Sequence, residues 1–413
     1  MSHPTARAGS AARPASRVRN PVDHAQDRWY ERHMWRYLWS AGLARLADEM
    51  VLFALVLLVA DRTGSVLLTA LTTAGYTLPA VVTGPVLGAW LDRTGRPLLA
   101  LAGNQFLLAG TALCLVFVPP PGMPLLAVLA GLALPMTSGG FTGMLPRLGV
   151  DLPRVTAYDS VLFSATAIVG PALAGGIAFT WSPAVAMVAV CLLGVLGGLC
   201  TLRLVLGPAP VSSHPSLVLA LRAGARHLVR TAPLRAATVA SVLSFAGFGM
   251  LVVALPWLVE STGADRSLGG VVMAVLDVGC VISVLALRPH LPRWLPERVL
   301  FVTIAAFGVA LVPWAFAETI GWLLAFALLA GLVQGPALTS LITARQRYSP
   351  PELLGQVSTT GASLKIGAFS LGALLTGLLP QGPGVVVLVV AACQLVAVAA
   401  GLVSGRATRA PVP

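Results

Sequence analysis

The stretch that decides the fold runs from Gly84 to Pro97 and reads GPVLGAWLDRTGRP. One acidic and two basic residues stand together in it, between an apolar run at 66–91 and another at 98–118. One helical crossing of a bilayer needs about 20 apolar residues, so each of these runs is long enough to cross. The stretch therefore predicts two antiparallel membrane helices joined by a charged turn at the membrane surface.

The same alternation of apolar runs and short polar turns extends in both directions. The twelve runs lie at 37–60, 66–91, 98–118, 125–145, 158–180, 183–206, 236–259, 267–287, 299–317, 319–342, 353–379 and 382–405. The chain has 413 residues, of which 57% are hydrophobic and 10% charged, whereas a soluble domain carries about 25% charged residues. This composition excludes a soluble globular protein and predicts an all-α membrane protein with twelve transmembrane helices.

An internal repeat divides the runs into two groups of six. A shift of 197 positions superimposes Gly170 on Gly367 and Gly175 on Gly372, so the fifth and eleventh runs share a rhythm of small residues. Parallel repeats of this kind are typical of transporters whose binding site lies between two halves. The predicted organisation is a disordered cytoplasmic tail at 1–36, a six-helix bundle at 37–206, an amphipathic cytoplasmic linker at 207–234, a second six-helix bundle at 235–405 and a cytoplasmic tail at 406–413.

Basic residues are distributed unevenly between the two kinds of turn. With the N-terminus placed inside, the inner segments hold 23 arginines and the outer loops hold only Arg62 and Arg266. Membrane proteins keep arginine and lysine on the cytoplasmic side. The first 36 residues also lack the apolar core of a secretory signal. We therefore expect a multi-pass protein of the inner cell membrane with both termini in the cytoplasm.

The linker contains a second regular pattern. Arg222, Arg226 and Arg230 recur every four residues, beside an apolar stripe that includes Leu217 and Leu228. One interpretation is an amphipathic helix on the inner leaflet, with its arginines toward anionic headgroups. The other is a helical linker with one solvated face, and the sequence leaves both open.

Several functions are disfavoured by what the sequence lacks. The five cysteines lie in apolar runs without a C-x-x-C pair, and the six histidines lie in tails or loops. This predicts no disulfide, metal site or cofactor, and no catalytic motif is present. The charge of +12 is spread over short turns, which does not suggest nucleic-acid binding. We expect a non-enzymatic, monomeric protein whose partners are a small-molecule substrate, protons and the lipid bilayer.

The charged turn resembles the signature loop G-x-x-x-D-R-x-G-R-R of the major facilitator superfamily. The matching residues are Gly88, Asp92, Arg93, Gly95 and Arg96, while Pro97 departs from the pattern where a second basic residue is common. With the twelve runs, the resemblance covers residues 37–405. It implies two pseudo-symmetric six-helix halves that rock about a central site.

The resemblance also implies that this loop is a conformational latch. Gly88 would allow close helix approach, and Asp92 would face the positive N-terminal end of the eleventh helix near Leu353. Gly95 would permit a tight turn with positive φ, while Arg93 and Arg96 would hold the loop at the inner surface. The alternative is an ordinary turn that only fixes topology.

The fifth run contains Thr166, Gly170, Pro171, Ala174 and Gly175 at fixed spacing. This is similar to the pattern G-x-x-x-G-P-x-x-G-G of drug/proton antiporters in the same superfamily, from which Thr166 and Ala174 depart. Plain helix packing, with a bend at the proline, explains the same residues. The arginine that some family antiporters carry in the fourth run is missing at 125–145.

Five charged residues fall well inside the runs, away from their ends, where a charge costs about 2.5–3.5 kcal/mol on insertion scales. They are Arg45, Asp48, Glu49, Asp277 and Lys365, and Gln334 is among the few strongly polar groups beside them. Arg45 is expected to pair with Asp48 or Glu49 along its own helix. Lys365 would neutralise the remaining acid or Asp277. Glu49 and Asp277 would carry protons while Asp48 is structural; the alternative is a fixed ion network.

The chain as a whole resembles bacterial exporters of macrolides and siderophores. That resemblance implies proton-driven export of small apolar or amphipathic compounds by an antiporter. Proton-coupled uptake of a nutrient is the alternative within transport, and a non-transporting membrane sensor is the alternative outside it. The scarcity of polar groups in the runs favours export.

Overall fold

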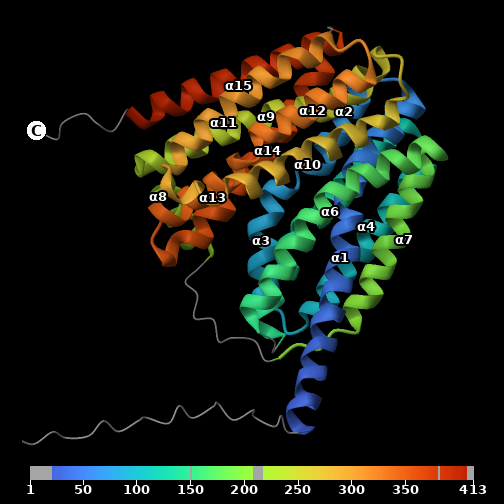
Figure 1. Ribbon diagram of the computed structural model, residues 1–413. Coiled ribbons are helices and arrows are strands. Elements are labelled where there is room, and N and C mark those ends of the chain that lie inside the picture. Colours follow the sequence, from blue (N-terminus) through green and yellow to red (C-terminus); the bar gives the residue numbers. More distant parts are fainter. Residues whose placement is uncertain (1–20, 149–150, 208–216, 380–381, 407–413) are drawn as a thin grey trace, which may run out of the picture.

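The structure is a computed structural model that describes residues 21–148, 151–207, 217–379 and 382–406. This part of the chain is a bundle of helices without a strand. In Figure 1 the helices of the two halves meet at the upper right and diverge from there, so that α1 begins at the bottom of the view and α15 ends at its left side. The all-α prediction is confirmed.

Each half is built from long helices joined by short turns. The first half contains α1 (Pro21–Thr63), α2 (Val66–Thr77), α3 (Ala80–Arg93), α4 (Pro97–Phe117), α5 (Met123–Met144), α6 (Leu152–Thr180) and α7 (Pro183–Leu202). The second follows α8 (Leu217–Arg230) and contains α9 (Ala232–Ser261), α10 (Gly269–Leu287), α11 (Pro296–Leu311), α12 (Ile320–Gln334), α13 (Pro336–Tyr348), α14 (Pro351–Leu378) and α15 (Pro383–Arg406). Many of these helices begin with proline, whose fixed φ suits the first helical position.

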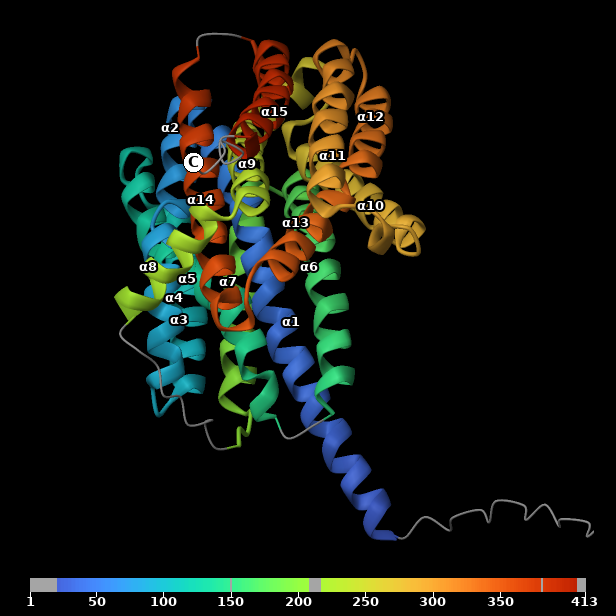
Figure 2. The ribbon, with the colours of Figure 1, turned by 90° about the vertical axis from the view of Figure 1, so that its left-hand side faces the viewer.

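Eleven stretches of the described chain are long and apolar enough to cross a membrane. The twelfth crossing is the second half of α1, whose apolar run is interrupted by Arg45, Asp48 and Glu49. This helix packs against α6 and α7 inside the bundle, as Figure 2 shows from the side. The twelve-helix prediction therefore agrees with the structure.

Two of the expected crossings are broken by proline. The run at 66–91 is divided at Pro79 into α2 and α3, and the run at 319–342 is divided at Gly335 and Pro336 into α12 and α13. Proline has no backbone N–H and clashes with the preceding turn, so it interrupts a helix. Each of these stretches is still one candidate crossing, Val66–Gly84 and Ile320–Tyr348, with a break inside it.

The segments outside the bundles also differ in detail from expectation. Helix α1 begins at Pro21, inside the segment 1–36 that was expected to be a disordered tail; residues 1–20 lie outside the described part. The linker at 207–234 contains α8, and residues 208–216 are not described. The expected tail at 406–413 also lies outside the description, apart from Arg406 at the end of α15.

The two halves touch at the end of the bundle away from the described chain ends. Here α6 crosses α10 so closely that a Cβ at Gly175 would lie 3.0 Å from the Cα of Gly270. On the other side α14 meets α2, where a Cβ at Gly377 would lie 2.7 Å from the Cβ of Ala70. The largest apolar core cluster contains residues of both halves. This end is closed, which leaves any opening between the halves at the opposite end.

Candidate functional site

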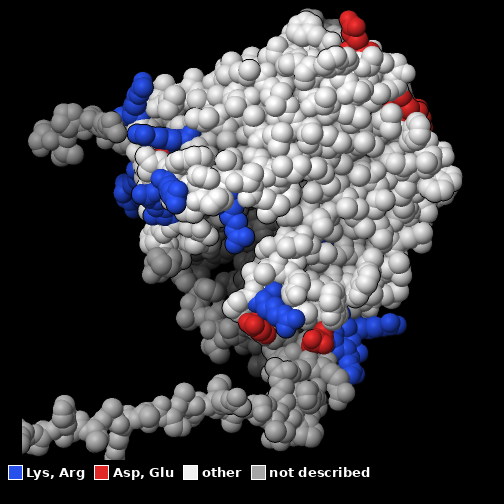
Figure 3. All heavy atoms as spheres, in the orientation of Figure 1, with Lys and Arg blue, Asp and Glu red and all other residues white. Residues whose placement is uncertain are grey.

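A cavity of about 840 Å³ lies between the halves. Its wall is formed by α6 of the first half and by α9, α10, α11, α12, α13 and α14. The space-filling view shows the molecule hollowed where the halves diverge (Figure 3). Most lining side chains are apolar, with a few polar groups among them. Pockets for small organic molecules typically have about 300–1,000 Å³ and this kind of lining.

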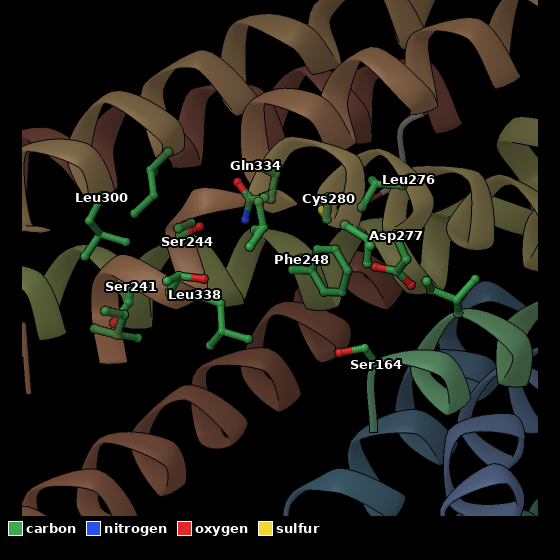
Figure 4. A pocket seen from close by; sticks show the side chains of 18 of the residues that line it. Ser164, Ser241, Ser244, Phe248, Leu276, Asp277, Cys280, Leu300, Gln334 and Leu338 are labelled. Atoms are coloured by element: carbon green, nitrogen blue, oxygen red, sulfur yellow. The ribbon is translucent and has the colours of Figure 1, made fainter. Parts of the chain in front are cut away.

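Asp277 of α10 is an acid on the wall of this cavity. Figure 4 shows its carboxyl group and Ser164 of α6 extending into the same end of the cavity. Within the described residues, Asp277 makes no hydrogen bond and no ion pair. An unpaired carboxyl group in an apolar wall can bind a proton or a cation.

Lys365 of α14 is a cation on the same wall. Its Nζ lies 3.6 Å from the ring centroid of Phe245 on α9, a cation–π contact. No carboxylate oxygen of the described chain lies within 4.0 Å of this nitrogen. The cavity therefore contains an acid and a base that are not paired in this conformation.

Gln334 also lines the cavity, at the break between α12 and α13. Its Oε1 is buried and has no hydrogen-bond partner among the described residues. The next residues, Gly335 and Ala337, belong to the wall as well. Pro336 has no N–H to donate to the carbonyl group one turn earlier. The helix break thus gives the apolar wall a side-chain amide that can hydrogen-bond a bound molecule.

Arg45 does not pair with the acids of its own helix, which corrects the expectation. Its Nη1 lies 2.7 Å from Oδ1 of Asp159 on α6, and the side chains of both residues are buried. Tyr37 donates to the same Oδ1 at 2.8 Å, and Thr142 of α5 donates to Oδ2 at 3.1 Å. The arginine side chain extends across to α6, where a buried carboxylate completes its hydrogen bonds.

Asp48 and Glu49 lie between α1, α2 and α6 and are not part of the cavity wall. The hydroxyl of Tyr76 on α2 donates to Asp48 at 3.4 Å. Glu49 packs against Gly170 of α6, where a Cβ would lie 2.5 Å from the Cβ of Glu49. Glu49 makes no hydrogen bond or ion pair within the described residues.

Glu49 and Asp277 nevertheless lie at similar depth in the bundle. The reference point is the contact between Gly175 and Gly270, from which the antiparallel helices α6 and α10 can be followed inward. At a rise of 1.5 Å per residue, Gly170, which contacts Glu49, lies about 7.5 Å inward from Gly175 along α6. Asp277 lies about 10.5 Å inward from Gly270 along α10.

The predicted latch is only partly described. Helix α3 ends at Arg93, and the surroundings of Gly88 and the side chains of Asp92 and Arg93 lie outside the description. The α3 backbone runs antiparallel to α14, with Gly84 opposite Ser363, so position 92 lies level with the first turns of α14.

The turn after α3 differs from expectation in one respect. Gly95 and Arg96 are exposed. Gly95 does not adopt positive φ, and open space surrounds the position of a Cβ on it. The expectation of a glycine-dependent turn at Gly95 was wrong, because the turn is made without positive φ at Gly95, between Thr94 in an extended conformation and Arg96 at the start of α4.

The small residues of the fifth and eleventh runs lie at helix crossings. Besides Gly170 and Gly175, a Cβ at Gly372 would overlap the carbonyl of Ala246 on α9, and one at Gly367 would lie 3.3 Å from Val81 of α3. Pro171 lies inside α6, and its carbonyl contacts Gly270 of α10. All of these positions serve close approach between helices.

Three buried polar residues are missed by reasoning from the sequence. Asp159 stands at the edge of its apolar run, where a surface position is the natural interpretation. Arg345 is an inner-surface arginine by the same reasoning, yet it is 8% exposed and its Nη2 is buried against Gly361. Gln394 of α15 accepts a hydrogen bond at 2.5 Å from Ser244, which lines the cavity. The only feature of the sequence that could have identified these three residues is that each is a polar residue in or next to a long apolar segment.

Two helical halves around a central cavity, closed at one end of a membrane-spanning bundle, define a membrane transporter. The chain belongs to the Major Facilitator Superfamily, whose sequence model matches residues 37–376. It is therefore a transporter of small molecules and not an enzyme, and the sensor interpretation is set aside.

Relatives of known sequence cover most of the chain. The chain is 30% identical to the MFS-type transporter y4rN of Sinorhizobium fredii over 83% of its own length and 87% of that protein. It is 27% identical to the multidrug efflux pump Tap of Mycolicibacterium fortuitum, over 84% and 89% of the two chains.

Solved structures with the same fold include a point mutant of the nucleoside transporter NupG. That structure has a TM-score of 0.77 and 15% identity, and the match covers 90% of this chain and 99% of NupG. A bacterial homologue of the human lysosomal transporter Spinster, in an inward-facing and unoccupied conformation, has a TM-score of 0.67 and 14% identity, with coverage of 92% and 97%. At these identities the likeness establishes the fold alone.

Proposed function

We propose that this protein exports small apolar or amphipathic compounds in exchange for protons, by alternating access. The observation that carries the proposal is the apolar cavity with an unpaired acid, Asp277, and an unpaired base, Lys365, on its wall. The apolar lining suits the body of a drug-sized compound. The relation to the efflux pump Tap supports the export direction.

The open end of the cavity faces the cytoplasm in this proposal. The chain ends and the arginine-rich turns lie on that side, as the positive-inside rule requires. An exporter in this conformation takes its substrate from the cytoplasm or the inner leaflet. Rocking of the halves would then open the contact between Gly175 and Gly270 and close the inner end.

Glu49 and Asp277 are the proposed proton carriers. They lie at similar depth on the two sides of α6, one in each half, and neither has a described hydrogen-bond partner. Asp48 has a partner in Tyr76 and is the structural acid. Lys365, on α14 of the second half, is the cation whose distance from Glu49 of the first half changes as the halves rock. A carboxyl group that gains or loses a nearby cation changes its proton affinity, and proton exchange requires such a change.

The loop from Gly88 to Arg96 is the proposed latch of the opposite, outward-open state. The antiparallel pairing of α3 with α14 supports it, because position 92 is level with the first turns of α14 and would approach the positive N-terminal end of that helix when the inner end closes. The small residues Gly170, Gly175, Gly367 and Gly372 give the helices room to rock.

The test uses purified protein in liposomes with a pH-sensitive dye inside. Ethidium is added on the side of the inner turns, and a proton gradient is imposed in either direction. We expect ethidium to move in the direction opposite to the protons. The dye should report a change of internal pH that depends on ethidium and has the sign expected for protons moving the other way. Movement of both in the same direction would establish symport and overturn proton-driven export.

Uptake of a polar nutrient is the second candidate. The specific observation in its favour is Gln334, whose buried amide at a helix break can select a hydrogen-bonding substrate. The fold is also that of a nucleoside transporter. The same liposomes distinguish the two functions if uridine and adenosine replace ethidium, since proton-coupled uptake predicts inward accumulation that follows the proton gradient.

A further inference from the structure

The linker helix α8 packs against the protein through residues of its apolar face. Gly224 packs so closely against α14 that a Cβ on it would lie 2.6 Å from the Cβ of Gln356. Leu228 belongs to a buried cluster with Leu234 of α9 and Val357 of α14. At Gly224 and Leu228 the apolar face of α8 is therefore occupied by the protein and is not available for insertion between acyl chains.

A polar contact also attaches α8 to the second half. The Nε2 atom of His227 lies 2.9 Å from the backbone carbonyl of Tyr348, at the end of α13. The hydroxyl of Tyr348 donates in turn to Glu297 of α11. Helix α8 is thus held to the inner ends of α11, α13 and α14, and Figures 1 and 2 show it beside α14 in both views.

The opposite face of α8 is a row of arginines. Arg222, Arg226 and Arg230 are exposed, and none forms an ion pair within the described residues. Each lies about 6 Å along the helix from the next. Helix α8 contains no acid, and like charges four residues apart destabilise a helix. Three unneutralised guanidinium groups in one row indicate an anionic partner outside the protein.

The surroundings of the row indicate what this partner is. Val229, between Arg226 and Arg230 on the exposed side, is 58% exposed. The row lies at the inner ends of membrane-spanning helices, where apolar surface gives way to basic residues, and Figure 3 shows basic side chains gathered at this edge of the molecule. An apolar side chain among arginines at the rim of the membrane belt suits a lipid better than a soluble polyanion.

We propose that the arginine row of α8 is a binding site for anionic phospholipid headgroups. Guanidinium groups bind phosphate oxygens in pairs of parallel hydrogen bonds. Helix α8 is attached to α14, which carries Lys365 and also packs on α3 of the first half. A lipid bound to the row would therefore stabilise the contact between the two halves. This proposal concerns the surface of the linker and does not depend on the substrate or the coupling ion.

The test measures lipid binding to detergent-purified protein by native mass spectrometry, with dioleoyl phosphatidylglycerol and dioleoyl phosphatidylcholine as probes. The test variant is Arg222→Gln/Arg226→Gln/Arg230→Gln. The control variant Arg288→Gln/Arg293→Gln/Arg298→Gln removes three arginines on the same side, two from the turn between α10 and α11 and one from the first turn of α11. Elution as a monodisperse peak in size exclusion shows that each variant is folded.

Wild type should prefer phosphatidylglycerol, and the preference should fall by about fivefold for each arginine neutralised, the factor that corresponds to about 1 kcal/mol per basic residue. The control should keep the wild-type preference, and an Arg→Lys version of the row should keep most of it. An unchanged preference in the test variant, or an equal loss in both variants, would overturn the proposal. So would competition by about 10 mM inorganic phosphate, a concentration that saturates millimolar binding, since that result would assign the row to a free anion.

Discussion

Arg45 of α1 and Asp159 of α6 form a buried ion pair with an Nη1–Oδ1 distance of 2.7 Å. The pair joins two helices whose residues are far apart in the sequence, and Tyr37 and Thr142 complete the hydrogen bonds of the carboxylate. It fixes α6, which is the helix of the first half that lines the cavity. One face of α6 is thus held by charge while the other faces the cavity.

The first prediction concerns this pair. Asp159→Asn and Arg45→Met each leave one charge buried without its partner, which costs about 3–5 kcal/mol. We expect each single variant to lower the melting temperature of the detergent-purified protein strongly. The double variant Arg45→Met/Asp159→Leu should recover most of the loss, because it leaves no unpaired charge. Equal melting temperatures for wild type and Asp159→Asn would show that the pair contributes nothing.

The second prediction concerns the closed end of the bundle. A Cβ at Gly175 would lie 2.5 Å from the carbonyl of Ser267, whereas one at Gly176 would meet nothing within 4 Å. Gly175→Leu should therefore hold the halves apart at this end, and Gly176→Leu should not. Accessibility of a cysteine introduced at Ser267 to a membrane-impermeant maleimide, in a background without native cysteines, reports the difference. Equal labelling in the two variants would show that the contact between α6 and α10 at Gly175 does not close this end of the bundle.

Much of the architecture followed from the sequence because lipid imposes simple rules. Hydrophobic length predicts each crossing, and the breaks at Pro79 and Pro336 were missed only because a proline in a membrane helix can be accommodated or can divide it. Asp277, Lys365 and Gln334 were singled out because polar residues inside a membrane helix are costly, and all three line the cavity. Their arrangement around one cavity needed the fold.

Side-chain partners were harder to predict than helices. Arg45 has acids three and four residues away on its own helix, yet its partner is Asp159, 114 positions later. Spacing along a helix identifies which groups can meet locally, but it does not include the neighbouring helix that offers more hydrogen bonds. Arg345 was misjudged for the same reason, since its burial depends on Gly361 of the next helix.

The third prediction concerns the latch. Asp92→Asn and Gly88→Leu should insert normally and transport poorly, because they weaken the dipole contact with α14 or add bulk at a helix contact. Gly95→Ala is the matched control, since Gly95 is exposed, lacks positive φ and has free space around it. Surface expression and substrate flux are measured together. Full flux in both latch variants would show that the loop only determines the membrane topology and is not a latch.

The fourth prediction concerns sidedness. Ser213 lies in the linker and Thr262 in the turn after α9, which the arginine distribution places on opposite sides of the membrane. In intact cells without native cysteines in the protein, an impermeant maleimide should label Thr262→Cys and should label Ser213→Cys only after the cells are opened. Labelling of Ser213→Cys in intact cells would reverse the proposed orientation and, with it, the side from which the cavity is filled.

The last prediction separates proton transfer from structure in the two unpaired acids. Glu49→Gln and Asp277→Asn keep the size and remove the charge, so the contact of Glu49 with Gly170 and the cavity wall at Asp277 should survive. If these acids carry protons, each variant should lose transport driven by a pH gradient while keeping substrate binding and counterflow exchange, which require no net proton movement.

Glu318→Gln, at an exposed position, is the control and should behave as wild type. Asp48→Leu should instead lower the melting temperature, since it removes the acceptor of the Tyr76 hydroxyl. If both Glu49→Gln and Asp277→Asn still concentrate substrate in response to the gradient, the two acids belong to a fixed ion network, and the proton must pass through another group.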